Sequence, residues 1–341
     1  MTSDLDLKDR ELLNIIQSSF PLVEEPFQHM GETLGLDESD VIQRIERMKA
    51  KNVVRQISAI FDTRRLGYKT MLVAMKTAPE EQDAAAQVIN RHPGVSHNYA
   101  RNSHYNLWFT LAVPPGGSLE DTVAQMADET GADSYRLMPT IRFFKIGVNF
   151  DMVKGEGAST KYYSPDGFDK KKERPKTDED AWKRAQALTD FEIDAVRELQ
   201  EDVTLEPRPF SEMAQRLGTS ERELFDLAAS FQDRGIMRRF SAVLHHRRAG
   251  FHSNGMAVWV VPPERSTEVG NIMAQSRWVT HCYERPTFPD WPYTHFTMLH
   301  AMSKEGCEAI AQEISQQTGI TDYQVLYSYR EYKKTRVRYF V

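Results

Sequence analysis

Apolar residues recur every three or four positions in three stretches of the first fifty residues, which predicts three short amphipathic helices. Their apolar stripes are formed by Leu12, Leu13, Ile15 and Ile16, by Phe27, Met30 and Leu34, and by Val41, Ile42, Ile45 and Met48. The pattern returns in the second half, with stripes formed by Ala195, Val196 and Leu199, by Phe210, Met213 and Leu217, and by Leu224, Leu227, Ala228 and Phe231. Three short helices followed by a two-stranded wing are typical of a winged helix-turn-helix. The sequence therefore predicts two such units, at residues 1–66 and 185–249.

A strand–helix–strand–strand–helix–strand order follows each set of helices. In the first copy the segments are 71–75, 80–91, 95–112 (a hairpin), 118–129 and 133–139, and in the second copy they are 256–261, 266–276, 279–301, 304–318 and 323–329. This order is that of a ferredoxin-like, or split βαβ, domain. We therefore expect an α+β protein with ferredoxin-like domains at 67–153 and 250–341, and a polar linker at 154–184 between the two copies.

The two copies can be aligned along their length. Residues 55–60 match 238–243 at an offset of 183, and two His-x-Tyr-x-Arg strings match at an offset of 184. At Gly131 and Gly319 the offset is 188, so the second copy has gained four residues just after its string, within 286–293. Repeats of this length are whole domains and not the units of a solenoid.

The two strings place the same three polar side chains on one face of a predicted strand in each copy. Alternate residues of a strand share a face, so His97, Tyr99 and Arg101 line up, and so do their counterparts His281, Tyr283 and Arg285. An imidazole, a phenol and a fixed cation on one surface suit a large anionic ligand. The alternative is the polar outer face of an antiparallel strand, but an idle face gives no reason for the same three residues to occur twice.

Composition and charge narrow the class of protein. Hydrophobic residues make up 40% of the 341 residues, yet no apolar run approaches the roughly 18 residues of a membrane helix. The acidic start does not read as a signal peptide, and Cys282 and Cys307 form no metal or redox motif. We therefore expect a cytoplasmic protein that does not enter a membrane. The net charge of −6 and the acidic residues that open both predicted third helices argue against specific nucleic-acid binding.

A helix-turn-helix followed by a ferredoxin-like domain resembles the Lrp/AsnC regulators, and the two halves together resemble a narrower family, the siroheme decarboxylases. The first copy carries the resemblance in Val-Ser-His-Asn-Tyr-x-Arg at 95–101 and Tyr-Asn-Leu-Trp-Phe-Thr at 105–110. The second copy carries it in His-Cys-Tyr-x-Arg-Pro at 281–286 and in the Pro- and Trp-containing segment 289–298. In that family the two subunit types are often separate chains, so their fusion here implies an intrachain pseudo-dimer, with homo-oligomers left open.

This resemblance implies a carboxy-lyase that removes carbon dioxide from two acetate side chains of siroheme, giving 12,18-didecarboxysiroheme in a heme or heme d1 biosynthetic route. Histidines can deliver protons near neutral pH, so the expected catalytic residues are His97, His281, Tyr99 and Tyr283. The route needs no cofactor and no metal held by the protein alone, because the iron belongs to the substrate. A histidine could instead ligate that iron.

Siroheme carries many carboxylates, which favour arginine partners. The expected substrate-binding residues are Arg101, Arg285, Arg238, Arg239, His245, His246, Arg247, Trp291, His295 and His104. Because the second copy holds more of them, we expect it to be the principal site. Two alternatives stay open from sequence: an Lrp/AsnC-type DNA-binding regulator, and a heme-binding protein without catalytic activity.

Overall fold

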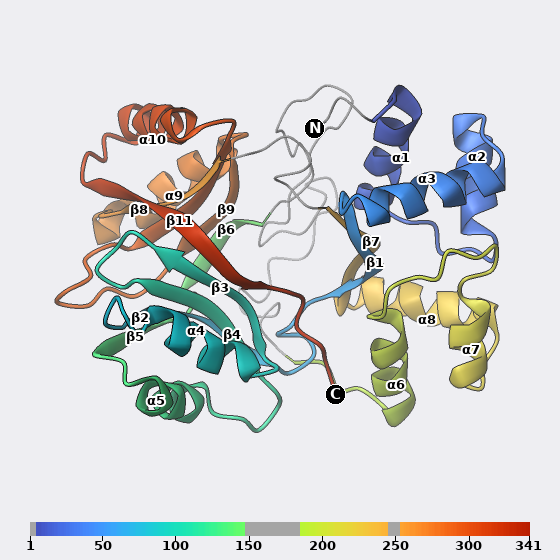
Figure 1. Cartoon of the computed structure of the whole chain (residues 1–341), viewed down its shortest axis with the longest axis horizontal. Helices are drawn as coiled ribbons and strands as arrows, with labels where there is room; N and C mark the ends of the chain where they lie inside the picture. The colour runs from blue at the N-terminus through green and yellow to red at the C-terminus, as the bar shows by residue number, and fades with distance from the viewer. Residues whose placement is uncertain (1–4, 147–184, 245–252) are drawn as a thin grey trace.

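The structure is a computed structural model that describes residues 5–146, 185–244 and 253–341 (Figure 1). The predicted linker at 154–184 lies outside these ranges. Each half begins with three helices: α1 (Leu7–Ser18), α2 (Pro26–Leu34) and α3 (Glu38–Ala50) in the first half, and α6 (Asp190–Leu199), α7 (Ser211–Arg216) and α8 (Glu221–Asp233) in the second. Both sets lie side by side at one end of the molecule, on the right in Figure 1, and share one apolar core. None of the helices in the described ranges is long and apolar enough to cross a bilayer.

Local signals in the sequence explain where these helices begin and end. Asp6 caps α1 by accepting a hydrogen bond from the backbone N–H of Asp9, and Ser220 caps α8 in the same way. Gly35 ends α2 with a positive φ of 67°. Gly31 is required by a close approach, since a Cβ there would lie 2.5 Å from the carbonyl oxygen of Leu36. The α2–α3 turn therefore depends on two glycines that serve different purposes.

The wing strands join the two copies instead of forming a hairpin within each. Strand β1 (Val54–Phe61) pairs antiparallel with β7 (Met237–Leu244) as a separate two-stranded sheet. Equivalent residues Ser58 and Ser241 face each other at its centre, which marks the pseudo-twofold axis of the molecule. The expected two-stranded sheet thus exists, but each copy supplies one strand. Both strands bury alternating residues in the shared helical core, so pairing across the copies satisfies their backbone and their apolar faces together.

The remaining strands form one nine-stranded sheet in the order β5-β2-β4-β3-β11-β8-β10-β9-β6. Its strands are β2 (Lys69–Lys76), β3 (Val95–Arg101), β4 (Leu107–Val113), β5 (Ser134–Met138), β6 (Arg142–Ile146), β8 (Ser253–Trp259), β9 (Val279–Glu284), β10 (His295–Ala301) and β11 (Tyr323–Lys334). Within each copy the order β5-β2-β4-β3 or β11-β8-β10-β9 is that of a ferredoxin-like domain. The α+β fold class with two tandem copies is confirmed.

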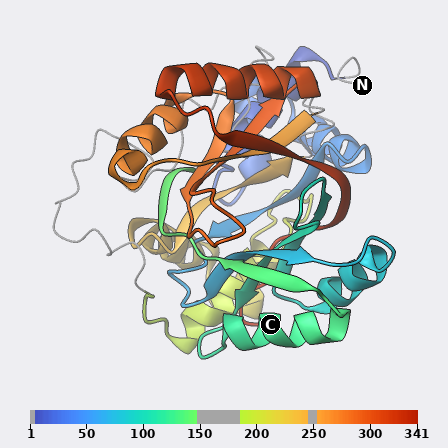
Figure 2. The same cartoon turned by 90° about the vertical axis from the view of Figure 1, so that its left-hand side faces the viewer.

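Helices cover the outer sides of this sheet. The first copy contributes α4 (Gln82–Arg91) and α5 (Leu119–Thr130), and the second contributes α9 (Ser266–Gln275), which follows the short 3-10 helix η3 (Pro263–Arg265), and α10 (Lys304–Thr318). Figure 2 shows α10 (red) and α5 (green) on opposite sides with the strands between them. Side chains of both copies meet on the inner face, where Trp108 of the first copy packs near Trp291 and Phe296 of the second.

The copies exchange their last strands. The first half of β11 pairs with β8 of its own copy, and its second half pairs with β3 of the other copy. In the first copy the equivalent chain is divided into β5, which pairs with β2, and β6, which pairs with β9. Two lysines hold the exchanged strands in place through hydrogen bonds between the copies. Lys145 Nζ donates to the carbonyl of Ser276, and Lys333 Nζ donates to that of Asn90. Each triplet-bearing strand, β3 and β9, is therefore held by a strand from the other copy.

Candidate active site

A cavity of about 850 Å³ lies where the β1–β7 pair faces the inner side of the nine-stranded sheet. Its lining draws on both copies: β1 and β7, strands of both ferredoxin-like domains, and residues 335–337 after β11. All six residues of the two triplets line it. The alternation expected from the sequence thus directs both His-Tyr-Arg faces into one shared chamber instead of two separate pockets.

The histidines of the two triplets are held in the same way. His97 Nδ1 lies 3.0 Å from the hydroxyl of Ser96, and His281 Nδ1 lies 3.0 Å from the hydroxyl of Thr280. The imidazole and phenol ring centroids are 6.2 Å apart in the first copy and 6.0 Å apart in the second. Because Nδ1 of each imidazole is engaged by its neighbour in sequence, Nε2 is the nitrogen left to meet a ligand.

The triplet arginines reach from one copy to the other. Arg101 donates to the carbonyl of Leu326 at 3.1 Å, and Arg285 donates to the carbonyl of Met138. These two carbonyls are 188 positions apart, so they are equivalent in the repeat. Each guanidinium also lies over the tyrosine of its own triplet, 5.5 Å from the ring centroid for Arg101 and 5.0 Å for Arg285. In both arginines the Nε atom is buried without a hydrogen-bond partner.

Positive charge dominates the lining. The cationic residues are Arg55, Arg64, Arg101, Arg238, Arg239, Arg285, Lys334 and Arg336, whereas Asp62 is the one carboxylate among the described residues that line the cavity. Asp62 pairs with Arg238 at 2.9 Å. Burial lowers the pKa of Arg101, Arg239, Arg285 and Arg336 to about 10, so all four stay charged at neutral pH. Such a surplus of enclosed cations calls for an anionic ligand.

Burial also keeps the cavity imidazoles neutral. It lowers the pKa of His97 to about 4, with Lys334 as the next cause. It lowers the pKa of His281 to about 3, with His300 as the next cause, and that of His300 to about 4, with Lys334 next. The rings keep some accessible surface, and all three line the cavity. Ligand carboxylates beside these rings would favour the charged form and raise each pKa toward neutrality.

Other predicted site residues lie elsewhere. Trp291 is buried, with its ring 5.2 Å from that of Trp108, and it is Trp108 that lines the cavity. His295 is fully buried, stacks on Phe144 and approaches the carbonyl of Ser266 at 3.0 Å. His104 is exposed beside Tyr105. None of these three residues is part of the cavity lining that the structure describes. The remaining three predicted residues, His245, His246 and Arg247, lie outside the described residues.

Two functional candidates were missed by the sequence analysis. His300 lies on β10 and lines the cavity with Phe296 and Met298, so the period of two along this strand could have found it. Arg336 enters from beyond β11, where no periodic pattern marks it. One of its terminal nitrogens donates to the hydroxyl of Ser58, and the other is buried without a partner. Among the described residues no group of three or more His, Cys, Asp or Glu is arranged to hold a metal ion.

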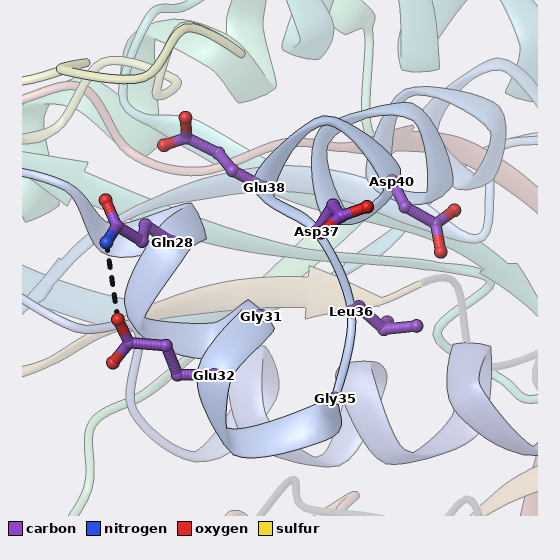
Figure 3. A pocket seen from close by; sticks show the side chains of 8 residues that line it. All are labelled: Gln28, Gly31, Glu32, Gly35, Leu36, Asp37, Glu38 and Asp40. Carbon is purple, nitrogen blue, oxygen red and sulfur yellow. Dashed lines mark hydrogen bonds between the residues drawn. The ribbon is translucent and has the colours of Figure 1, made fainter.

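The helix-turn-helix surface has the opposite charge. A hollow at the α2–α3 turn is lined by Gln28, Gly31, Glu32, Gly35, Leu36, Asp37, Glu38 and Asp40 (Figure 3). The cations of α3 are already engaged, since Arg44 and Arg47 both bind Asp9 at 2.8 Å. Carboxylates at the start of the helix that would face DNA repel phosphates. The start of α3 in the first copy therefore does not favour contact with DNA phosphates.

Comparisons with known proteins agree with the division into repeats. The model of the AsnC-like ligand binding domain matches residues 65–145 and 248–333, and the model of the siroheme decarboxylase NirDL-like HTH domain matches residues 9–55 and 192–238. The chain is 30% identical to the siroheme decarboxylase NirDL subunit of Paracoccus denitrificans, over 91% of this chain and 89% of that protein. It is 46% identical to the siroheme decarboxylase beta subunit of Methanosarcina barkeri, over 43% of this chain and 97% of that subunit.

Solved structures show the same likeness. The crystal structure of the siroheme decarboxylase NirDL superposes with a TM-score of 0.73 at 34% identity, covering 98% of this chain and 94% of that chain. A second structure of NirDL, in complex with an iron-uroporphyrin III analogue, superposes with a TM-score of 0.72 at 33% identity and covers 98% of this chain and 95% of that chain. This chain is 39% identical to the siroheme decarboxylase of Hydrogenobacter thermophilus, over 97% of this chain and 94% of that protein. The resemblance seen in the sequence is therefore confirmed, and the chain belongs to the siroheme decarboxylase family.

Proposed function

We propose that this protein is a carboxy-lyase that removes carbon dioxide from two acetate side chains of siroheme, giving 12,18-didecarboxysiroheme in a heme or heme d1 route. The observation that carries the proposal is the pair of matched His-Tyr-Arg triplets facing one cavity rich in cations. Family membership supports the reaction, and the NirDL complex with an iron-uroporphyrin III analogue supports a tetrapyrrole as the ligand class. The iron is part of the substrate, and the route needs no further cofactor.

The arginines bind the carboxylates of the macrocycle. Arg101, Arg285 and Arg336 each have a buried nitrogen without a partner, and a guanidinium can grip a carboxylate with two parallel hydrogen bonds. Because Arg101 and Arg285 are each fixed to a carbonyl of the other copy, their positions are set before the substrate arrives. Both of these arginines are buried, which strengthens such interactions.

The histidines supply protons. Loss of carbon dioxide from a pyrrole acetate leaves an electron pair on the methylene carbon, and one proton converts that carbon into a methyl group. A macrocycle that is protonated beforehand takes up those electrons as carbon dioxide leaves, and it loses that ring proton again once the methylene carbon has been protonated. His97 and His281 are placed to give protons from Nε2 once the substrate carboxylates have raised their pKa. Tyr99 and Tyr283, beside these rings, can hydrogen-bond a carboxylate or help to pass the proton.

The test is anaerobic incubation of the purified protein with siroheme, followed by mass spectrometry of the extracted tetrapyrrole. We expect a product lighter by two molecules of carbon dioxide. The matched control is the double variant His97→Asn and His281→Asn, which keeps polar side chains in the cavity and should yield unchanged siroheme. If the unaltered protein binds siroheme and returns it intact, the proposal is wrong, and a binding or delivery role takes its place.

A further inference from the structure

In the second copy one hydroxyl group joins two imidazoles. Thr280 Oγ1 lies 3.0 Å from His281 Nδ1 and 2.9 Å from His300 Nε2. All three residues line the cavity, and the two rings lie on neighbouring strands, β9 and β10. In the first copy Ser96 makes the same contact with His97, but the residue equivalent to His300 is Ala112. The described part of the first copy therefore has the hydroxyl–imidazole pair without a second ring behind it.

The hydrogens of this group are coupled. A hydroxyl has one hydrogen, so Thr280 can donate to one imidazole and accept from the other. Among the residues that the structure describes, the other acceptor near that hydroxyl is the carbonyl of Met298, at 3.5 Å, which is the outer limit of a hydrogen bond. If Thr280 donates to His281 Nδ1, both neutral rings carry their hydrogen on Nε2, the form that neutral histidine prefers in water. The reverse direction would place both hydrogens on Nδ1, the less favourable form.

We propose that His300 is a positioning residue for His281. Its Nε2–H donates to the hydroxyl of Thr280, the hydroxyl donates to His281 Nδ1, and the hydrogen of His281 is thereby held on Nε2, facing the cavity. This inference rests on the proposed function for its consequence. With its Nε2–H facing the cavity, His281 is oriented toward the substrate, and once the ring has taken up a second proton at Nδ1, the Nε2 proton can pass to the substrate carbon and leave a neutral ring. The first copy has no equivalent donor at position 112, so its histidine is not fixed by this route.

The consequence is that the two triplets are unequal in a specific way. The step served by His281 depends on His300 and Thr280, whereas the step served by His97 does not. Removal of His300 should slow one loss of carbon dioxide by about tenfold to 100-fold, the range typical when a residue that orients a metal-binding histidine is removed. The other loss should keep its rate, so a singly decarboxylated intermediate accumulates.

The first measurement does not depend on catalysis. Nitrogen NMR of the substrate-free protein labelled at histidine reports which ring nitrogen of His281 carries hydrogen. We expect Nε2–H in the unaltered protein and a mixture of both forms in His300→Phe and in Thr280→Val. His300→Gln, whose amide N–H can also donate to Thr280, should restore the Nε2–H form. A hydrogen on Nδ1 of His281 in the unaltered protein, or a form insensitive to all three variants, would overturn the proposal.

The second measurement follows both decarboxylations in time. His300→Phe and Thr280→Val should each accumulate the singly decarboxylated tetrapyrrole, and their combination should do no worse than either alone because they interrupt the same chain. His300→Gln should recover most of the rate, which separates positioning from loss of packing. Equal slowing of both steps, or no recovery with glutamine, contradicts the assignment. If the unaltered protein shows no decarboxylation, the proposed function fails while the NMR result still decides the role of His300.

Discussion

The two triplets differ less in their own geometry than in what surrounds them. In both copies a hydroxyl residue holds the histidine, the arginine lies over the tyrosine, and the guanidinium reaches a carbonyl of the other copy. Around these matched contacts the copies diverge. Arg55 and Gln56 of the first copy are equivalent to Arg238 and Arg239 of the second, and Ala112 is equivalent to His300. Conserving the triplet while changing its neighbours is what two successive reactions on one unsymmetrical macrocycle would require.

The same comparison shows why the cavity is shared. Arg101 and Arg285 each need a carbonyl of the other copy, that of Leu326 on β11 and that of Met138 at the end of β5. Asp62 of the first copy pairs with Arg238 of the second. Neither triplet is therefore complete within its own half, and a substitution in one copy alters the contacts of the triplet in the other.

The largest effect is expected from replacing one histidine at a time. His97→Asn and His281→Asn should each remove one proton donor, lowering the rate of one decarboxylation by about 100-fold to 10,000-fold. Time-resolved mass spectrometry should then show a singly decarboxylated product in both variants, and NMR of the isolated products should place the remaining acetate at a different position in each. If one variant retains both steps at full rate, the two triplets do not divide the reaction as we propose.

Exchange of a triplet arginine for lysine should have the next largest effect. Lysine keeps the charge but has no planar fork with which to hold both a carbonyl and a carboxylate. We expect Arg101→Lys and Arg285→Lys each to weaken siroheme binding by about 1.5–3 kcal/mol, the worth of a hydrogen bond to a charged group. Anaerobic absorption titration measures the loss, and Arg136→Lys, which pairs with Asp290 away from the cavity, is a matched control. Losses no larger than that of the control would exclude the triplet arginines as carboxylate anchors.

Protonation should distinguish the empty from the occupied cavity. The pKa values of His97, His281 and His300 lie at about 4, 3 and 4 in the folded protein, below their ordinary value near 6.5. Between those pH values the unfolded chain binds more protons than the folded protein does. The free energy of unfolding should therefore fall as pH drops from about 6.5 toward 4. Urea denaturation at pH 7 and pH 5 measures this, and His300→Gln should flatten the slope.

Binding of siroheme should reverse this lowering of the histidine pKa values. Carboxylates beside the imidazoles raise their pKa, so protons are taken up on binding near pH 6. Calorimetric titration in two buffers with different heats of ionisation counts these protons. Binding without proton uptake would mean that the cavity histidines stay neutral beside the ligand, which would exclude them as charged donors.

The smallest effect is expected at the helix-turn-helix. Glu38→Gln and Asp37→Asn lie at the α2–α3 turn, away from the cavity, and should change the free energy of unfolding by less than about 0.5 kcal/mol. Neither should alter the rate of decarboxylation. Gel-shift measurements at low salt should show no binding of duplex DNA by the unaltered protein. A specific complex with DNA would reopen the regulator alternative despite the acidic helix.

Sequence reasoning was most successful where a regular period governs side-chain direction. Alternation along 97–101 and 281–285 placed both triplets on the cavity, and the order of helices and strands gave the ferredoxin-like topology. The partner of a strand has no such signature. The burial pattern of β1 is the same as that of β7, and nothing in either shows that they pair with each other across the copies.

The sequence was also a poor guide to side chains whose surroundings are set by tertiary packing. His295 interrupts an apolar segment as a ligand-binding residue would, but Thr294 and the carbonyl of Ser266 satisfy both of its ring nitrogens inside the core. Trp291 lies in the four-residue gain of the second copy, where a surface role was plausible, yet it fills the space between Tyr105 and Trp108. Whether such a side chain is buried or binds a ligand depends on residues that are distant in the sequence, and the local sequence pattern does not show which of these will be its neighbours.

The exchange of last strands has a consequence for how this chain can be divided. A cut between 147 and 184 would give two fragments, each possessing the strand that completes the other's sheet and lacking the one that completes its own. Separately expressed fragments should therefore be unstable alone and recover their fold as a complementing pair. The covalent connection raises the effective concentration of each half around the other. Fused and two-chain members of one enzyme family would then differ in how their assembly responds to dilution, with the active chamber unchanged.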